Sequence, residues 1–124
     1  MERYEYVHLK ITTLFGAKSE EHRQIIDKYA QKGCRYAGWI PTNIDSEGKI
    51  KELDLIFEKT SGPARHYVFV NAEIHRVFGA KSEEHRKIIE EQSVKGCRFI
   101  GFIPTNLNSY GMIKAMDLVF ERGI

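Results

Sequence analysis

The sequence Phe-Gly-Ala-Lys-Ser-Glu-Glu-His-Arg occupies residues 15–23 and recurs without a change at residues 78–86. The same offset of 63 residues aligns the rest of the chain without a gap, and about half of the paired positions are identical. Self-similarity at a fixed offset indicates a repeated structural unit. We therefore expect a tandem repeat of two units, each about 60 residues long.

The boundary between the two units is marked by composition. Residues 59–64, Lys-Thr-Ser-Gly-Pro-Ala, form the most turn-prone stretch of the chain, because Ser, Gly and Pro favour turns over regular structure. We place the first unit at residues 1–61, a linker at residues 62–66 and the second unit at residues 67–124. The two units are also compatible with one compact, pseudo-dimeric domain.

Each unit begins with the pattern of a strand and a helix. Val7 and Leu9 alternate with polar and aromatic residues, which predicts a strand with one apolar face. A helix is expected next, because Ser19 is a good N-cap and Gly33 stands where a C-terminal cap belongs. The apolar stripe of this helix is expected to pack on the sheet. The second helix has a weaker stripe, so its C-terminal half is expected to be less buried.

Two further strands complete the unit. Residues 34–40 form a short segment rich in aromatic and apolar residues, which predicts a strand, and we expect Pro41 to end this strand. Residues 50–58 alternate again, with Leu53, Leu55 and Phe57 on one face. The pattern predicts an α+β protein of two βαββ repeats, with antiparallel strands and one helix per repeat.

The two units are expected to pack together. A unit of about 60 residues buries only about 60% of its unfolded surface and is marginally stable alone. We expect an approximate two-fold axis within the chain, as in a symmetric dimer. The sequence leaves open whether the units share one six-stranded sheet or pack face to face.

The composition is that of a soluble globular protein. Apolar residues make up 42% of the chain and charged residues 29%, with 19 Lys and Arg against 17 Asp and Glu. No apolar run approaches the ~20 residues that cross a bilayer, and the N-terminal residues are too polar for a secretory signal. We therefore expect a cytoplasmic protein that does not bind membranes. A net charge of +2 is too small to indicate nucleic acid as a partner.

The sheet face turned away from the helix is expected to be aromatic in both units. It is expected to carry Tyr4, Tyr6, Arg35, Ala37, Trp39, Asp54 and Ile56 in the first unit, and Tyr67, Phe69, Arg98, Ile100, Phe102, Asp117 and Val119 in the second. Large exposed apolar patches on soluble proteins mark interfaces or grooves. We expect this face to be covered by the other unit, a second copy of the chain, a partner protein or a small ligand. The candidate binding residues are Tyr6, Arg35, Trp39, Asp54, Phe69, Arg98, Phe102 and Asp117.

Two pairs of charged residues are predicted on this face. Arg35 with Asp54, and Arg98 with Asp117, fall on neighbouring strands, so we expect a cross-strand ion pair in each unit. Such a pair either neutralises two charges beneath a covering layer or anchors a ligand or partner in an aromatic groove.

The start of each predicted helix is a candidate anion site. Its residues are Lys18 and Ser19 in the first unit and Lys81 and Ser82 in the second, because backbone amides at a helix N-terminus, with a lysine and a hydroxyl, bind phosphate or carboxylate groups. The alternative is a tight turn into a capped helix. The nucleotide-binding loop motif is absent from the sequence.

The remaining reactive side chains are expected to be structural. His22 and His85 fall in the first turn of each helix and are expected to pack or cap rather than act as general bases. Cys34 and Cys97 are expected to be buried free thiols. The histidines and cysteines lack the spacing of a metal site, so we expect no metal and no cofactor.

Several short motifs resemble a known family. They are Tyr4-Glu5-Tyr6-Val7 opening a strand, Lys32-Gly33 followed by Arg35, and the closing Leu55-Ile56-Phe57-Glu58-Lys59. With these motifs, the chain resembles two fused copies of the small bacterial family called domain of unknown function 4177. The resemblance implies the same architecture and brings no established activity, cofactor or catalytic residue.

We expect a non-enzymatic interaction or assembly module that self-associates as a homo-oligomer, namely a dimer, through the aromatic sheet face, because no catalytic constellation accompanies that face. A protein partner is compatible with the same face. The alternative is a small-ligand-binding protein with a cleft between the repeats. An enzyme ranks lower, because the sequence shows no catalytic constellation. A binder of single-stranded nucleic acid also ranks lower, because the face carries acidic beside basic residues.

Overall fold

The computed structural model describes residues 3–10, 21–73, 84–107 and 113–123. Its elements are β1 (Tyr4–Lys10), α1 (Glu21–Gln31), β2 (Arg35–Ile44), β3 (Ile50–Glu58), β4 (Tyr67–Glu73), α2 (Glu84–Val94), β5 (Cys97–Leu107) and β6 (Ile113–Arg122). The strands form two antiparallel sheets, the first in the order β1-β3-β2 and the second in the order β4-β6-β5. The predicted α+β class, with one helix beside each three-stranded antiparallel sheet, is confirmed.

The two sheets have the same register. Tyr4 lies opposite Glu58 in the first sheet, and Tyr67 lies opposite Glu121 in the second, 63 residues later along both strands. The register shifts recur at the same offset, as in the shift between Tyr36 and Gly38 and its counterpart in β5. Residues 63 apart therefore occupy equivalent places within their own sheets.

The first helix ends where its glycine predicts. Gly33 has a φ of 86°, its N–H donates to the carbonyl of Ala30 at 2.9 Å, and the N–H of Cys34 donates to the carbonyl of Tyr29 at 3.1 Å. These two bonds are those of a Schellman cap, in which glycine takes the left-handed conformation at little cost. The predicted N-cap at Ser19 lies outside the described residues.

The first helix packs on the apolar face of its own sheet. Ile26 and Ala30 are buried there with Leu55 and Phe57, and the ring of Tyr29 stacks on Phe57 with centroids 4.4 Å apart. Full burial of a large apolar side chain contributes about 1.5–3 kcal/mol. The second helix has no buried residue in its described length, which agrees with its weaker apolar stripe.

The bulge in β2 corrects the expected position of Trp39. The register shifts between Tyr36 and Gly38, where Gly38 has a φ of 145°, and Trp39 lies opposite the buried Leu55. Because directly opposed residues share a sheet face, Trp39 lies on the helix side of the sheet rather than on the opposite face. An extra residue in one strand reverses the side chains that follow it up to the next register shift. Phe102 lies opposite the buried Leu118, so it too is on the helix side of its sheet rather than on the expected face.

The prediction that Pro41 ends its strand was wrong. The strand β2 continues to Ile44, and Pro41 lies opposite Leu53 within the ladder. In the order β1-β3-β2, this strand is at the edge of the sheet. A proline is tolerated there, because the side of an edge strand without a neighbour needs no N–H donor. Pro104 lies within β5 in the same way.

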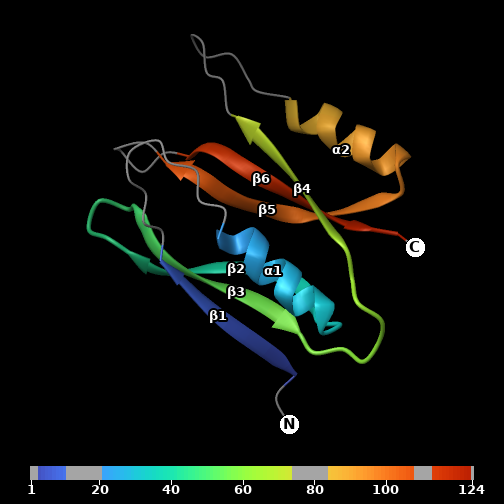
Figure 1. Cartoon of the computed structure of the whole chain (residues 1–124). Helices are drawn as coiled ribbons and strands as arrows, with labels where there is room; N and C mark the ends of the chain where they lie inside the picture. The colour runs from blue at the N-terminus through green and yellow to red at the C-terminus, as the bar shows by residue number, and fades with distance from the viewer. Residues whose placement is uncertain (1–2, 11–20, 74–83, 108–112, 124) are drawn as a thin grey trace.

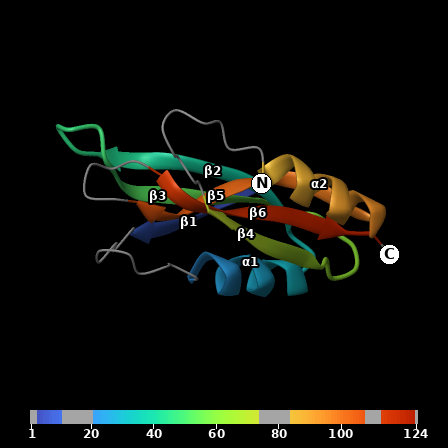
Figure 2. The ribbon, with the colours of Figure 1, turned by 90° about the horizontal axis from the view of Figure 1, so that it is seen from above.

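The two units pack face against face and share a core. Figure 1 shows the sheets as separate layers with α1 beside the space between them, and Figure 2 shows α1 and α2 on opposite sides of the strands. Ile103 and Val119 of the second sheet join one apolar cluster with Leu9, Ile26 and Leu55 of the first unit. The first unit therefore covers the face of the second sheet that lies opposite α2.

The contacts between the units do not have the expected two-fold symmetry. His22 of α1 contacts Asp117 of β6, so a two-fold axis would place His85 of α2 against Asp54 of β3. Instead, His85 is exposed and Asp54 bonds to His8 of its own sheet. The arrangement is head to tail, with the helix side of one unit against the opposite side of the next.

The segment between the units, residues 59–66, lies against the end of α1. The N–H of Arg65 donates to the carbonyl of Ala30 at 3.0 Å, and the hydroxyl of Thr60 donates to the carbonyl of Gly33. These bonds fix the path of the chain from β3 to β4.

Neither described helix is long and apolar enough to cross a membrane.

Candidate functional site

The candidate binding residues fall in four places. Tyr6 and Asp54 lie on the face of the first sheet opposite α1, whereas Phe69 and Asp117 lie between the units. Trp39 and Phe102 meet where β2 approaches β5. Arg35 and Arg98 each pair with a glutamate of their own sheet. The structure therefore does not bring them together as one site.

Asp117 is the centre of the polar contact between the units. Its Oδ2 lies 2.6 Å from Nε2 of His22 and accepts a bond of 2.7 Å from Nε of Arg23, whose Nη2 donates to Oδ1 at 2.8 Å. Asn71 donates to Oδ1 at 3.1 Å. Burial by itself would raise the pKa of Asp117, but the hydrogen bonds from Arg23, His22 and Asn71 lower this pKa well below its ordinary value. The carboxylate is therefore ionised and fully bonded in the interior.

Aromatic contacts surround this polar centre. The ring of His22 meets that of Phe69 edge-on, with centroids 6.1 Å apart, and the guanidinium of Arg23 lies 5.6 Å from the centre of the Phe69 ring. Tyr67 also contacts the first unit, because its hydroxyl accepts a hydrogen bond of 2.8 Å from the N–H of Tyr36. The first unit therefore covers the aromatic face of the second sheet, and another unit was one of the coverings expected for this face.

The described residues leave the corresponding face of the first sheet uncovered. We call it the open sheet face and define it by Tyr4, Tyr6, Ile40, Asp54 and Ile56. Tyr6 is 65% exposed and Ile40 is 55% exposed, whereas Ile103, the equivalent of Ile40, is 1% exposed. The difference comes from the packing of the units, since the registers of the two sheets are the same.

His8 adds a titratable group beside the open sheet face. Its Nε2 lies 2.9 Å from Oε1 of Glu52 and its Nδ1 lies 3.2 Å from Oδ1 of Asp54. The hydrogen bonds to Glu52 and Asp54 raise the pKa of His8 above its ordinary value. Within the described residues, Oδ2 of Asp54 accepts no hydrogen bond.

The predicted ion pairs of arginine with aspartate were wrong in both units. Arg35 lies opposite Glu58 and donates to it at 2.9 Å, while Arg98 lies opposite Glu121 and donates to it at 3.1 Å. Each aspartate lies four residues before the glutamate in the central strand, opposite Ile40 in the first sheet and Ile103 in the second, and so too far from the arginine for a pair. Hydrogen bonds from Arg35 and Arg3 lower the pKa of Glu58 below its ordinary value.

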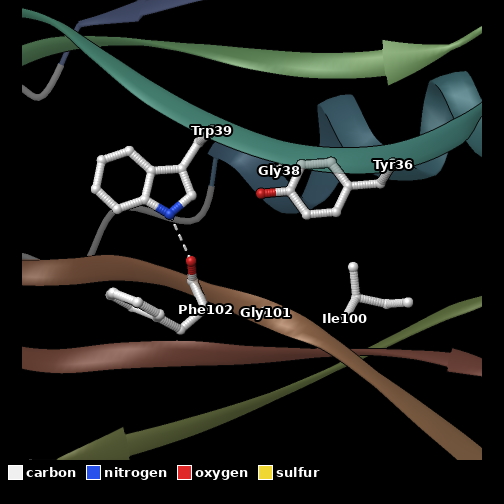
Figure 3. Close-up of a pocket in the computed structure, with 6 residues that line it drawn as sticks. All are labelled: Tyr36, Gly38, Trp39, Ile100, Gly101 and Phe102. Carbon is white, nitrogen blue, oxygen red and sulfur yellow. Dashed lines mark hydrogen bonds between the residues drawn. The ribbon is translucent and has the colours of Figure 1, made fainter.

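A small pocket lies between β2 and β5 (Figure 3). Its volume is about 220 Å³, and it is lined by Tyr36, Gly38, Trp39, Ile100, Gly101 and Phe102. Nε1 of Trp39 donates to the carbonyl of Phe102 at 2.6 Å, and the two rings meet edge-on. The pocket walls are mostly apolar, and its polar groups are few.

The remaining expectations concern the anion site, the cysteines and metal binding. The candidate anion residues Lys18, Ser19, Lys81 and Ser82 lie outside them. Both cysteines are buried free thiols, as predicted. In the described ranges, no group of three or more His, Cys, Asp or Glu residues is placed to hold a metal ion.

The contact of His22 and Arg23 with Asp117 was not predicted. These residues are separated by more than 90 positions and meet only because the units pack head to tail. The one available sequence signal was the unchanged repeat of His-Arg in both units, together with an aspartate at the same offset.

Comparison with models of protein families, with curated proteins and with solved structures finds no match to this chain. The resemblance to domain of unknown function 4177 therefore stays a prediction.

Proposed function

We propose that this chain is a non-enzymatic assembly module that self-associates through the open sheet face. The observation that carries the proposal is the exposure of Tyr6, at 65%, on a sheet face whose equivalent in the second unit is covered. A sheet face that carries two tyrosines and two isoleucines buries apolar area when it meets a partner, and this burial is the main favourable term in protein association.

The polar groups of the open sheet face fit such a role. Asp54 and its neighbour His8 lie on the same sheet face as the exposed Tyr6, and His8 is itself half exposed. Interfaces combine an apolar centre with a few polar contacts that set orientation. This composition supports binding to another macromolecular surface more than it supports catalysis.

Size-exclusion chromatography with light scattering tests the proposal. We expect the wild type to form oligomers whose mass rises with concentration and Tyr6→Lys to be a monomer with an unchanged circular dichroism spectrum. The matched control is Val94→Lys, since Val94 is 88% exposed and lies on α2, away from the open sheet face. A wild type that stays monomeric at high concentration contradicts the proposal.

Binding of a small ligand in the pocket between β2 and β5 is the second candidate. The pocket is lined by residues of both units. A binding cleft between the repeats would be lined in this way. Its volume of about 220 Å³ is below the ~300–1,000 Å³ of typical ligand sites, so this function ranks second. A thermal-shift screen of metabolites tests it, because ligand at 100 times its Kd stabilises a protein by about 2.7 kcal/mol.

A further inference from the structure

Most of the exposed apolar side chains are repeat equivalents of side chains that pack between the two units. Seven large apolar side chains are exposed in the described residues: Tyr4, Tyr6, Ile40, Ile44, Val94, Phe99 and Phe102. Five of them are equivalents, at the offset of 63 residues, of side chains that pack between the units, namely Tyr67, Phe69, Ile103, Tyr36 and Trp39. Both halves of the internal contact thus have uncovered copies on the surface.

One uncovered copy is the open sheet face. Its Tyr4, Tyr6 and Asp54 are the equivalents of Tyr67, Phe69 and Asp117, which the first unit covers. The registers of the two sheets place these residues identically within their strands.

The other uncovered copy lies on the helix side of the second unit. We call it the open helix side and define it by His85, Phe99 and Phe102, the equivalents of His22, Tyr36 and Trp39. His85 is exposed, Phe99 is 41% exposed and Phe102 is 39% exposed. In the first unit, the equivalent residues are those that contact the second unit.

We infer that a second copy of this chain docks head to tail, with its open helix side on the open sheet face of the first. This inference rests on the proposed self-association and adds which surface meets which. In the internal contact, His22 bonds to Oδ2 of Asp117. In the contact between copies, His85 takes the place of His22 and Asp54 that of Asp117.

The polar groups on the two surfaces are complementary. Asn71 bonds to Oδ1 of Asp117, and His8 contacts Oδ1 of Asp54 in the same way. Nε2 of His22 bonds to Oδ2 of Asp117, whereas Oδ2 of Asp54 accepts no hydrogen bond from the described residues. The oxygen that the internal contact uses is therefore open on the surface, and His85 is the equivalent donor.

The geometry also has a consequence for the assembly. The two surfaces are different, so each copy that docks leaves one of each uncovered. A heterologous contact of this kind builds a ring when its rotation closes and a filament when it does not. A dimer in which the two open sheet faces pair with each other would, in contrast, leave both open helix sides free.

Complementation of two variants tests the inference. Tyr6→Lys blocks the open sheet face, and His85→Asp blocks the open helix side by placing a second negative charge against Asp54. We expect each variant alone to be monomeric by light scattering and a 1:1 mixture to form a heterodimer of twice the mass, because each supplies the surface that the other lacks. Phe99→Lys is a second variant of the open helix side, because the ring of Phe102 contacts Trp39 inside the chain whereas the ring of Phe99 contacts Phe120 of its own sheet. Val94→Lys is expected to assemble like the wild type.

The other outcomes separate the two proposals. If His85→Asp and Phe99→Lys assemble like the wild type and Tyr6→Lys does not, and the mixture forms no heterodimer, then the open sheet faces pair with each other. That result overturns the head-to-tail inference and leaves self-association standing. If the wild type itself is monomeric, both proposals are wrong.

Discussion

Nε2 of His22 lies 2.6 Å from Oδ2 of Asp117, and both side chains are buried although 95 positions separate them in the sequence. Arg23 adds two bonds to the same carboxylate. The contact joins α1 of the first unit to the central strand of the second sheet, so it reports directly on how the two units pack.

Replacing the buried carboxylate is expected to destabilise the fold. Asp117→Asn removes the charge that His22 and Arg23 contact, and removing one partner of a buried pair costs about 3 kcal/mol or more. The matched control is Asp54→Asn, whose equivalent carboxylate is partly exposed, and there the loss is expected to stay below about 1 kcal/mol. Urea unfolding at low protein concentration measures both. Equal losses in the two variants would show that the contact between units does not depend on Asp117.

The same pair predicts how stability changes with pH. Because the folded pKa of Asp117 is lowered, its contribution is fully present above the unfolded value of about 3.9. The contribution is lost only as the pH falls through the folded pKa. We expect the difference in unfolding free energy between wild type and Asp117→Asn to be constant from pH 6 to pH 4 and to shrink in stronger acid. A difference that already shrinks between pH 6 and pH 5 would contradict the assignment.

His8 is expected to titrate above its ordinary pKa of about 6.5, because Glu52 and Asp54 accept hydrogen bonds from its protonated ring. Because the folded pKa of His8 is raised, the hydrogen bonds of its protonated ring stabilise the fold at a pH below the unfolded pKa. This contribution is lost as the pH rises through the folded pKa. An NMR titration of the His8 ring in the Tyr6→Lys variant measures it. Glu52→Gln is expected to lower the pKa of His8, and an unchanged value would show that the ring does not bond to Glu52.

Two glycines with the same backbone conformation offer a matched comparison. Gly33 has a φ of 86° and Gly96 a φ of 84°, but a Cβ on Gly33 would lie 2.9 Å from the carbonyl oxygen of Gly62, whereas a Cβ on Gly96 meets nothing within 4 Å. Gly96→Ala is expected to cost about 1 kcal/mol from its left-handed conformation. Gly33→Ala is expected to cost clearly more in thermal unfolding, because the segment between the units must also move.

The fold was largely predictable because its signals are local. The alternation of Leu53, Leu55 and Phe57 predicted one buried face, and Gly33 predicted the end of α1. The face of Trp39 was not predicted, since it depends on a bulge that one glycine within a strand signals only weakly.

The candidate site was less predictable because it depends on register and packing. Arg35 and Asp54 share a sheet face, but only the register shows that Arg35 lies opposite Glu58. The contact of His22 with Asp117 requires the orientation of one unit on the other, and no spacing within either unit encodes it.

The central claim is that the helix side of one copy meets the open sheet face of another, and cross-linking tests it most directly. Cys34 and Cys97 are buried, so Asp54→Cys and His85→Cys each add one accessible thiol. With a short bis-maleimide, we expect a covalent dimer on a denaturing gel from the 1:1 mixture and none from either variant alone. A dimer from Asp54→Cys alone, or none from the mixture, would contradict the account.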